Sequence, residues 1–168
     1  MAGEIINKVA EANIQQIDLA SFKSNTNWME IDLKEQLWNE LVLKEKDFRK
    51  WVKETDWSVY ENQFVFIHCS NDAIIPAWAF MLITVQLEGA AYIHCGDKAS
   101  AEEAIFFKNL ADWDIDHLKD QRVMVKGCSD IPKPNKAYIE LTNKLVPTVK
   151  SLMFGEPCSA VPVYKKKA

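Results

Sequence analysis

The sequence lacks the short motifs of the common redox and cofactor-binding folds. It has four cysteines but no Cys-x-x-Cys pair, which argues against a thioredoxin-like protein and against a zinc ribbon. It has no Gly-x-Gly-x-x-Gly and no P-loop motif, so no pattern in it indicates nucleotide binding. Linkers and low-complexity segments are also missing, and 48% apolar with 26% charged residues is an ordinary globular composition. We therefore expect a single domain over residues 1–168.

The chain also lacks an excess of basic residues and a long hydrophobic run. Its formal net charge is −4, whereas proteins that bind nucleic acids usually present a basic face. The longest apolar stretch covers the 15 residues 73–87, contains Pro76 and is too short to span a bilayer. The first residues do not have the basic region and apolar region of a secretory signal. We expect a cytoplasmic protein with reduced thiols, and no nucleic-acid or membrane partner.

Strand-like and helical patterns alternate from about residue 61 onward. Three short β-rich runs cover residues 63–69, 90–95 and 122–128. Helical patterns follow them over residues 73–89, 98–113 and 132–155, the last with an expected kink at Pro147 and an end at Gly155. Alternation of this kind predicts βαβ units and a parallel sheet with helices on its faces. The predicted fold is α/β: a three-layer sandwich with a mainly parallel sheet.

The pattern of the N-terminal third, about residues 1–60, predicts an α+β extension. This extension would be attached to the α/β core, which is expected at about residues 61–168. Residues 4–14 have a helical pattern, residues 28–33 (WMEIDL) are typical of a strand, and residues 43–57 predict an amphipathic helix. The apolar side chains of this second helix share one side and are expected in the core: Leu43, Phe48, Trp51 and Val52.

Three of the four cysteines are followed directly by a serine: Cys69, Cys128 and Cys158. Cys69 and Cys128 each end a predicted strand, and the carboxyl ends of parallel strands share the edge of a sheet where ligands bind. Cys158 follows the last predicted helix and would reach that edge through a Gly-Glu-Pro turn. A loop that turns just after a cysteine directs N–H groups at the sulfur and lowers its pKa, as metal binding requires. We therefore predict one site shared by these three thiols.

Acidic residues follow two of these thiols closely. Asp72 comes three residues after Cys69, and Asp130 comes two residues after Cys128. Either carboxylate could complete a four-coordinate site or act as a base, and Asp72, near a predicted helix start, is a better candidate ligand than His68.

Histidines precede two cysteines, in the pairs His68-Cys69 and His94-Cys95. Neighbouring residues of a strand point to opposite faces, so the members of a pair cannot both face one metal within a strand. We expect His68 and His94 to be packed or capped rather than ligating. Cys95 has no following serine and stays outside the predicted site.

Three hypotheses on function follow from this pattern. The first is a metal–thiolate protein that binds zinc or an iron–sulfur species through Cys69, Cys128 and Cys158, with Asp72 or Asp130 as the fourth ligand. The second is a metal-free thiol enzyme or sulfur carrier with a cysteine nucleophile of low pKa. The third is an interaction module with packed cysteines, which would use the aromatic-rich residues 51–60 as its contact surface.

Three long stretches of the chain carry a resemblance to a known family. They are residues 41–81 (from LVLKEKDFRKW to IIPAWAFM), residues 125–142 (VKGCSDIPKPNKAYIELT) and residues 150–167 (KSLMFGEPCSAVPVYKKK). The chain resembles the bacterial family catalogued as domain of unknown function 2480, which carries no established activity. Members of that family are often encoded beside components of iron–sulfur cluster assembly. The resemblance thus implies an accessory factor in that process, with iron–sulfur assembly proteins as partners.

Overall fold

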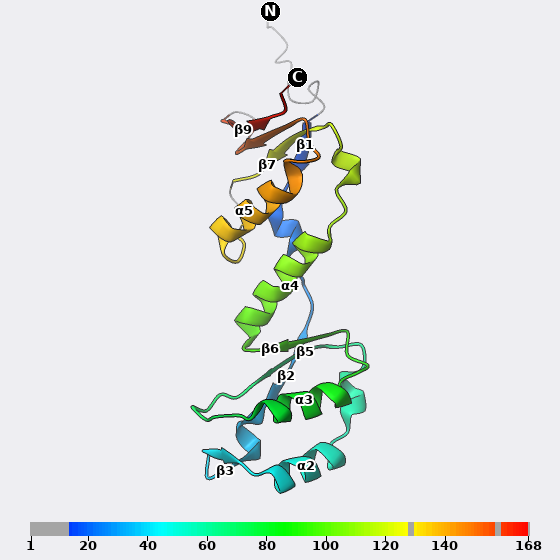
Figure 1. The fold of residues 1–168 in the computed structure, drawn as a ribbon, viewed down its shortest axis with the longest axis vertical. Coiled ribbons are helices and arrows are strands. Elements are labelled where there is room, and N and C mark those ends of the chain that lie inside the picture. Colours follow the sequence, from blue (N-terminus) through cyan, green and yellow to red (C-terminus); the bar gives the residue numbers. More distant parts are fainter. Residues whose placement is uncertain (1–13, 128–129, 157–158, 168) are drawn as a thin grey trace, which may run out of the picture. The chain divides into compact units, whose positions relative to one another are not determined.

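The computed structural model describes residues 14–127, 130–156 and 159–167 (Figure 1). Its helices are α2 (Glu45–Glu54), α3 (Ala77–Gln86), α4 (Lys98–Asp112) and α5 (Pro134–Leu145). Its longer strands are β1 (Ile14–Ile17), β2 (Trp28–Asp32), β5 (Phe64–His68), β6 (Tyr92–Cys95), β7 (Arg122–Val125), β8 (Ser151–Phe154) and β9 (Val161–Lys165). The two-residue strands β3 (Leu37–Trp38) and β4 (Val42–Leu43) pair in an antiparallel ribbon. The short 3₁₀ turns are η1 (Leu19–Phe22), η2 (Leu33–Gln36), η3 (Trp57–Tyr60) and η4 (Asp116–Leu118). Within the described ranges, no helix is both long and apolar enough to cross a membrane.

The contacts of the chain form two compact units, and the boundary between them falls inside α4. Unit 1 comprises Met1–Lys23 and Ile105–Ala168, and unit 2 comprises Ser24–Ala104. Each unit has its own sheet and its own hydrophobic core. The expectation of a single domain, with an extension up to about residue 60, stays a prediction.

Unit 2 is built on a three-stranded parallel sheet in the order β2-β5-β6. Alternate strand residues, among them Ile31, Val65 and Ile67, point to one face and are buried there. Helices α2 and α3 lie on the same side of this sheet (Figure 1), and Phe48 and Val52 of α2 join that core. The two α2 residues are four positions apart, one helical turn, which is the spacing of a buried helix stripe.

Unit 1 is built on a four-stranded sheet in the order β1-β7-β8-β9. Strands β1, β7 and β8 are parallel, and β9 is antiparallel to β8. The core forms where α5 and residues 105–112 of α4 lie against this sheet (Figure 1). Its members from β7, β8 and the two helices include Val123, Val125, Leu152, Phe106, Leu110, Leu141 and Leu145.

The prediction of an α/β fold with mainly parallel strands is confirmed, as are the three predicted strands and the amphipathic helix α2. The inference that the three strands share one sheet is wrong, because β7 belongs to the sheet of unit 1. The single long helix predicted for residues 132–155 is also wrong. Helix α5 ends at Leu145, ahead of Pro147, and Gly155 follows the strand β8. Of the helix predicted for residues 4–14, residues 4–13 lie outside the described ranges, and Ile14 begins β1.

The two units repeat one backbone plan, beginning with a strand, an aspartate and a 3₁₀ turn. Asp18 follows β1 and its Oδ1 accepts a hydrogen bond from the N–H of Ala20 at 2.9 Å. Asp32 ends β2 and its Oδ1 accepts from the N–H of Lys34 at 3.0 Å. The leucine after each aspartate is fully buried. Each aspartate thus caps a short turn and turns the chain out of the sheet.

The repetition continues around the central strand of each sheet. Asn62 and Asp120 have φ of 57° and 55°, and each precedes a glutamine that leads into the strand. The N–H of Asn62 donates to the carbonyl of Gly89 at 2.8 Å, and the N–H of Asp120 donates to Thr148 at 3.0 Å. Asparagine and aspartate tolerate this left-handed conformation better than other non-glycine residues. Because the turns are shared, each residue of β5 has an equivalent residue in β7.

The third strand of each repeat is followed by a glycine with positive φ, Gly96 at 140° and Gly155 at 112°. Their N–H groups donate to Ile67 and Val125, at 3.0 and 2.9 Å, and these two acceptors occupy equivalent positions in β5 and β7. The units are therefore matched residue by residue at the carboxyl edges of their sheets.

Candidate functional site

Two carboxylates and an imidazole meet at the carboxyl edge of the unit 2 sheet. Glu30 and Asp32 lie on one face of β2, and His68 is the last residue of β5, directly paired with Asp32 in the parallel register. One ligand atom from each of the three side chains lies within 4.8 Å of the others. The Nε2 of His68 is 2.6 Å from Oε1 of Glu30. We call these three residues the carboxylate–histidine edge.

The carboxylate of Asp32 is held ionised by its surroundings. Its side chain is 16% exposed, and burial alone would raise its pKa. Hydrogen bonds from the hydroxyl and N–H of Ser70 and from the N–H of Lys34, together with the charge of His68, instead lower the pKa of Asp32 to about 2. The N–H groups of Ser70 and Lys34 both bond to Oδ1, each at 3.0 Å. The other oxygen of Asp32, Oδ2, lies 3.5 Å from the Nζ of Lys34.

The imidazole of His68 is held in place on its apolar side. Its ring centroid lies 5.5 Å from that of Phe66, the previous residue on the same face of β5. The side chain of His68 is 20% exposed, whereas that of Glu30 is 56% exposed. The edge therefore has a rigid partly buried pair, Asp32 and His68, and a freer carboxylate, Glu30.

A second histidine at this end of the sheet makes a structural contact. The Nε2 of His94 lies 3.0 Å from Oγ of Ser100, which itself donates to the backbone oxygen of Asp97 at 2.8 Å. A Cβ on Gly96 would lie 2.5 Å from that Oγ and 3.0 Å from that Nε2, so only glycine permits this approach. Hydrogen bonds from Ser100, and then the charges of His68 and His94, lower the pKa of Asp97. Asp97 caps the start of α4, because its Oδ1 accepts a hydrogen bond from the N–H of Ser100 at 2.8 Å.

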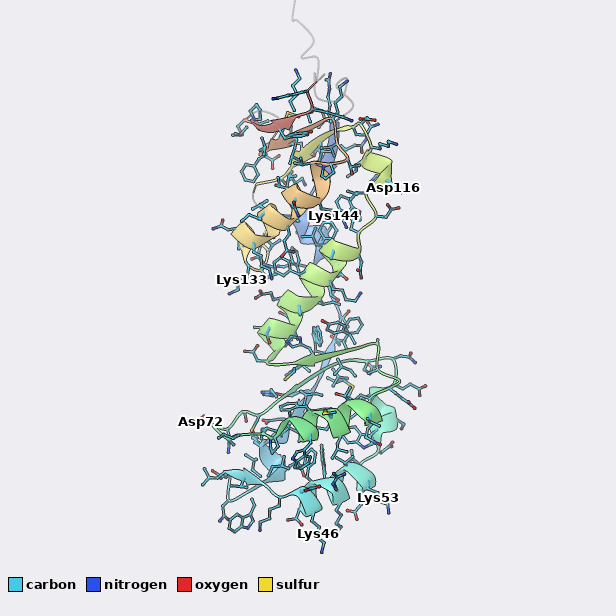
Figure 2. All side chains as sticks on the ribbon, viewed as in Figure 1. Lys46, Lys53, Asp72, Asp116, Lys133 and Lys144 are labelled. Atoms are coloured by element: carbon cyan, nitrogen blue, oxygen red, sulfur yellow. The ribbon has the colours of Figure 1, made fainter. Side chains whose placement is uncertain are left out.

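The thiol of Cys69 lies on the other side of the strand from the imidazole of His68. Cys69 is half-buried and packs against the core of unit 2, as expected from the alternation of strand residues. Asp72 is exposed at the outer end of the loop between β5 and α3 (Figure 2). Within the described residues, the group that could hold a metal includes neither Cys69 nor Asp72.

The other predicted ligands belong to unit 1. Cys128 and Cys158 lie outside the described residues, so the predicted site of Cys69, Cys128, Cys158 and Asp72 stays a prediction. Asp130 is exposed and its carboxylate is 2.8 Å from Nζ of Lys23, whose hydrogen bond and charge lower the pKa of Asp130.

The edge of unit 1 that matches the carboxylate–histidine edge contains a lysine. In the repeated plan Asp18 corresponds to Asp32, and Lys126, the residue after β7, corresponds to His68. The Nζ of Lys126 lies 3.3 Å from Oδ2 of Asp18, and the N–H of Lys126 donates to Ile17 at 2.9 Å. Gln16 stands where unit 2 has Glu30. A cation thus faces the equivalent aspartate in unit 1.

The predictions from the sequence did not include Glu30 or Asp32. The alternation in the strand pattern WMEIDL placed both residues on one face, and this signal was available. The pairing of β2 with β5, which brings His68 against them, requires contacts between residues that are distant in the chain.

The aromatic residues considered as a contact surface are part of the core of unit 2. Trp51, Trp57 and Tyr60 all pack against it, and the Nε1 of Trp57 donates to the carbonyl of Val52 at 2.7 Å. Desolvation by this packing raises the pKa of Tyr60. Their placement favours a role in stability over a role in binding a partner.

Comparison with known proteins places almost the whole chain within one family. A family model described as "Protein of unknown function (DUF2480)" matches residues 3–166. No curated protein and no solved structure matches the chain. The family was the one that the three sequence stretches indicated.

Proposed function

We propose that this chain, which belongs to the DUF2480 family, binds one divalent transition-metal ion at the carboxylate–histidine edge of unit 2. The observation that carries the proposal is the convergence of one oxygen of Glu30, one oxygen of Asp32 and one ring nitrogen of His68 within 4.8 Å. The three residues come from two adjacent parallel strands and lie at the edge where ligands of α/β sheets bind.

The spacing of the ligand atoms suits a metal ion after a small adjustment. Ligands at about 2.0 to 2.2 Å from a tetrahedral metal lie about 3.3 to 3.6 Å from one another. The Nε2 of His68 and the Oε1 of Glu30, now 2.6 Å apart, would separate by less than about 1 Å when a metal replaces the proton between them. Glu30 is exposed and free to make that movement, whereas Asp32 and His68 are held by their neighbours.

The chemistry of the ligands narrows the choice of metal. Imidazole and carboxylate groups together suit Zn²⁺, Fe²⁺ and Mn²⁺, and the absence of a thiolate among the three disfavours Cu⁺. Three protein ligands leave a coordination position for water or a small anion. The carboxylate of Asp32 is charged at neutral pH, so a metal ion does not have to displace a proton from it.

Isothermal titration of the metal-free protein with Zn²⁺, and with Fe²⁺ under nitrogen, tests the proposal. We expect one ion per chain in the wild type and no measurable binding in His68→Ala. His117→Ala is the matched control, because His117 is an exposed histidine of η4 outside this edge. Equal binding by His68→Ala and the wild type would remove the carboxylate–histidine edge from consideration.

A metal–thiolate site is the second candidate. It is supported by the position of Cys69, a free thiol directly after the carboxyl end of β5, and by the Cys-Ser pairs of the sequence. Cys69, Cys128 and Cys158, with Asp72, would bind zinc or an iron–sulfur species, and the partners would be iron–sulfur assembly proteins. Protein purified without air should then contain metal that is lost in Cys128→Ser and retained in His68→Ala.

The metal-free thiol hypothesis is separated from both by alkylation. A cysteine nucleophile would react quickly with iodoacetamide near neutral pH, in protein that contains no metal. Uniformly slow reaction of all four cysteines would rule that hypothesis out.

A further inference from the structure

We infer that the edge of unit 1 is equivalent to the metal site of unit 2, and that the ammonium group of Lys126 occupies the place that a metal ion takes in unit 2. This inference rests on the proposed function of unit 2 and names the residues that restrict metal binding to that unit. Gln16 and Lys126 would be the specificity-determining residues, and the chain would bind one ion rather than two.

The equivalence of the two edges follows from the backbone. Strands β5 and β7 both begin one residue after a glutamine, and Gln63 and Gln121 accept matching hydrogen bonds from residues 91 and 150, at 2.9 and 2.8 Å. Counting from these glutamines, His68 and Lys126 are both the fifth residue. Each stands against an aspartate that caps a 3₁₀ turn.

The charges at the two edges differ although their backbones match. The edge of unit 2 has two carboxylates, those of Glu30 and Asp32, beside the imidazole of His68, and Lys34 is a neighbouring cation. At the matching positions of unit 1, the structure describes the carboxylate of Asp18, the ammonium of Lys126 at 3.3 Å from it, and the uncharged Gln16. These positions thus supply a counter-ion for Asp18 and have an amide where unit 2 has its second carboxylate.

A tethered ammonium excludes a metal ion for two reasons. Lys126 is attached to the neighbouring strand, so its Nζ is present at a high effective concentration beside Oδ2 of Asp18. An ammonium group is also a donor with no lone pair, so Lys126 cannot become a ligand while it is charged. Histidine at this position, by contrast, has a ring nitrogen whose lone pair binds a metal ion once its proton is displaced.

Exchange of the residues between units gives a direct test. The variant Gln16→Glu, Lys126→His should create in unit 1 a copy of the carboxylate–histidine edge. The variant Gln16→Glu, Lys126→Met is its matched control, because it has the new carboxylate and loses the ammonium but has no imidazole. The reverse variant His68→Lys should place an ammonium beside Asp32 and exclude the metal from unit 2.

The experiment measures the number of Zn²⁺ ions bound per chain in each full-length protein by titration and by metal analysis. We expect one ion in the wild type, none in His68→Lys, two in Gln16→Glu, Lys126→His and one in the matched control with Lys126→Met. A triple variant that combines Gln16→Glu, Lys126→His and His68→Lys should bind one ion, in unit 1. Circular dichroism of each variant establishes that it is folded.

The outcomes separate this inference from the proposed function. A wild type without metal contradicts the proposed function, whatever unit 1 does. A folded Gln16→Glu, Lys126→His protein that binds no more ions than its parent overturns the inference. If that variant does not fold, His68→Lys decides: loss of the ion at unchanged thermal stability supports the inference. A fall in Tm as large as that of His68→Ala contradicts it.

Discussion

In unit 2 the aspartate that caps the first 3₁₀ turn faces a histidine, and in unit 1 the equivalent aspartate faces a lysine. The three parallel strands, the capped turns, the left-handed residue ahead of the central strand and the glycine after the third strand are the same in both. Among the described strands, the β3–β4 ribbon of unit 2 and the antiparallel β9 of unit 1 are additions to this plan. At the matched carboxyl edges, the differences lie in side chains that contribute little to either core. We infer from this contrast that the backbone plan supports a cation beside the aspartate, and that the side chains decide which cation it is.

The same comparison does not explain the Cys-Ser pairs. Cys69 comes directly after His68, whereas Cys128 comes two residues after Lys126. In the matched numbering Cys69 therefore corresponds to Gly127, and the first two Cys-Ser pairs are offset by one residue. The pairs stay a feature of the sequence that the repeated backbone plan leaves unexplained.

The largest effect should come from the buried leucine after each capping aspartate. Leu33 and Leu19 are both fully buried, so Leu33→Ala and Leu19→Ala should each lower the free energy of unfolding by about 2 to 5 kcal/mol. We expect Leu33→Ala to reduce hydrogen-exchange protection within residues 24–104 first, and Leu19→Ala to do so within residues 105–156. Equal loss of protection in both units for each variant would contradict their separate cores.

His68→Ala and Lys126→Ala should differ most in metal binding. Removal of the imidazole should weaken Zn²⁺ binding by at least about 100-fold, since one of three ligands is lost. Lys126→Ala should leave the affinity of unit 2 unchanged within about two-fold, because the unit 2 ligands remain. Competition with a zinc-sensitive dye measures both, and a comparable loss in the two variants would break the distinction between the units.

Asp32 should affect both stability and its dependence on pH. Asp32→Ala should cost about 1 to 2 kcal/mol, because the N–H groups of Lys34 and Ser70 lose their acceptor. The pKa of Asp32 is lowered from 3.8 to about 2 in the folded protein. Its charge therefore stabilises the fold above about pH 4, and this contribution is lost as the pH falls toward 2.

Asparagine at this position keeps an acceptor for the cap but cannot ionise. Asp32→Asn should flatten the decline of stability between about pH 4 and pH 2, as measured by urea unfolding at each pH. An unchanged acid dependence in Asp32→Asn would show that other carboxylates account for it.

The smallest effect should come from Lys34, which lies 3.5 Å from Oδ2 of Asp32. It is exposed, so its charge is screened and its competition with a metal ion is weak. Lys34→Ala should strengthen Zn²⁺ binding about two- to five-fold at low salt, and the gain should vanish near about 1 M salt. Lys53→Ala, on α2 (Figure 2), is the control with an equal change in net charge.

Local patterns were sufficient to predict much of the fold. The β-rich runs gave β5, β6 and β7, and the spacing of Phe48 and Val52 gave the buried side of α2. Strand β8 was missed because its four residues, 151–154, follow a helical pattern without a strong break. The division into two sheets was missed because strand pairing depends on residues far apart in the chain, such as Trp28 with Phe64.

The candidate site was harder to predict than the fold. The sequence directed attention to thiols because cysteine is scarce and the Cys-Ser pairs are conspicuous, whereas Glu30 and Asp32 are two of 24 acidic residues. Their significance arises only when β2 pairs with β5 in the register that sets Asp32 against His68. The expectation that His68 and Cys69 face opposite sides was correct. At the end of β5, His68 therefore belongs to the carboxylate–histidine edge, and Cys69 belongs to the predicted thiolate site.

The proposed metal site of unit 2 uses a ring nitrogen of His68, and the chain has three histidines. Nitrogen-15 NMR of the imidazoles during titration with Zn²⁺ can therefore identify the ligand. We expect the Nε2 resonance of His68 to shift until one equivalent of Zn²⁺ has been added, while those of His94 and His117 stay in place. A shift of His94 or His117 instead, or no shift of any imidazole, would contradict the proposed site.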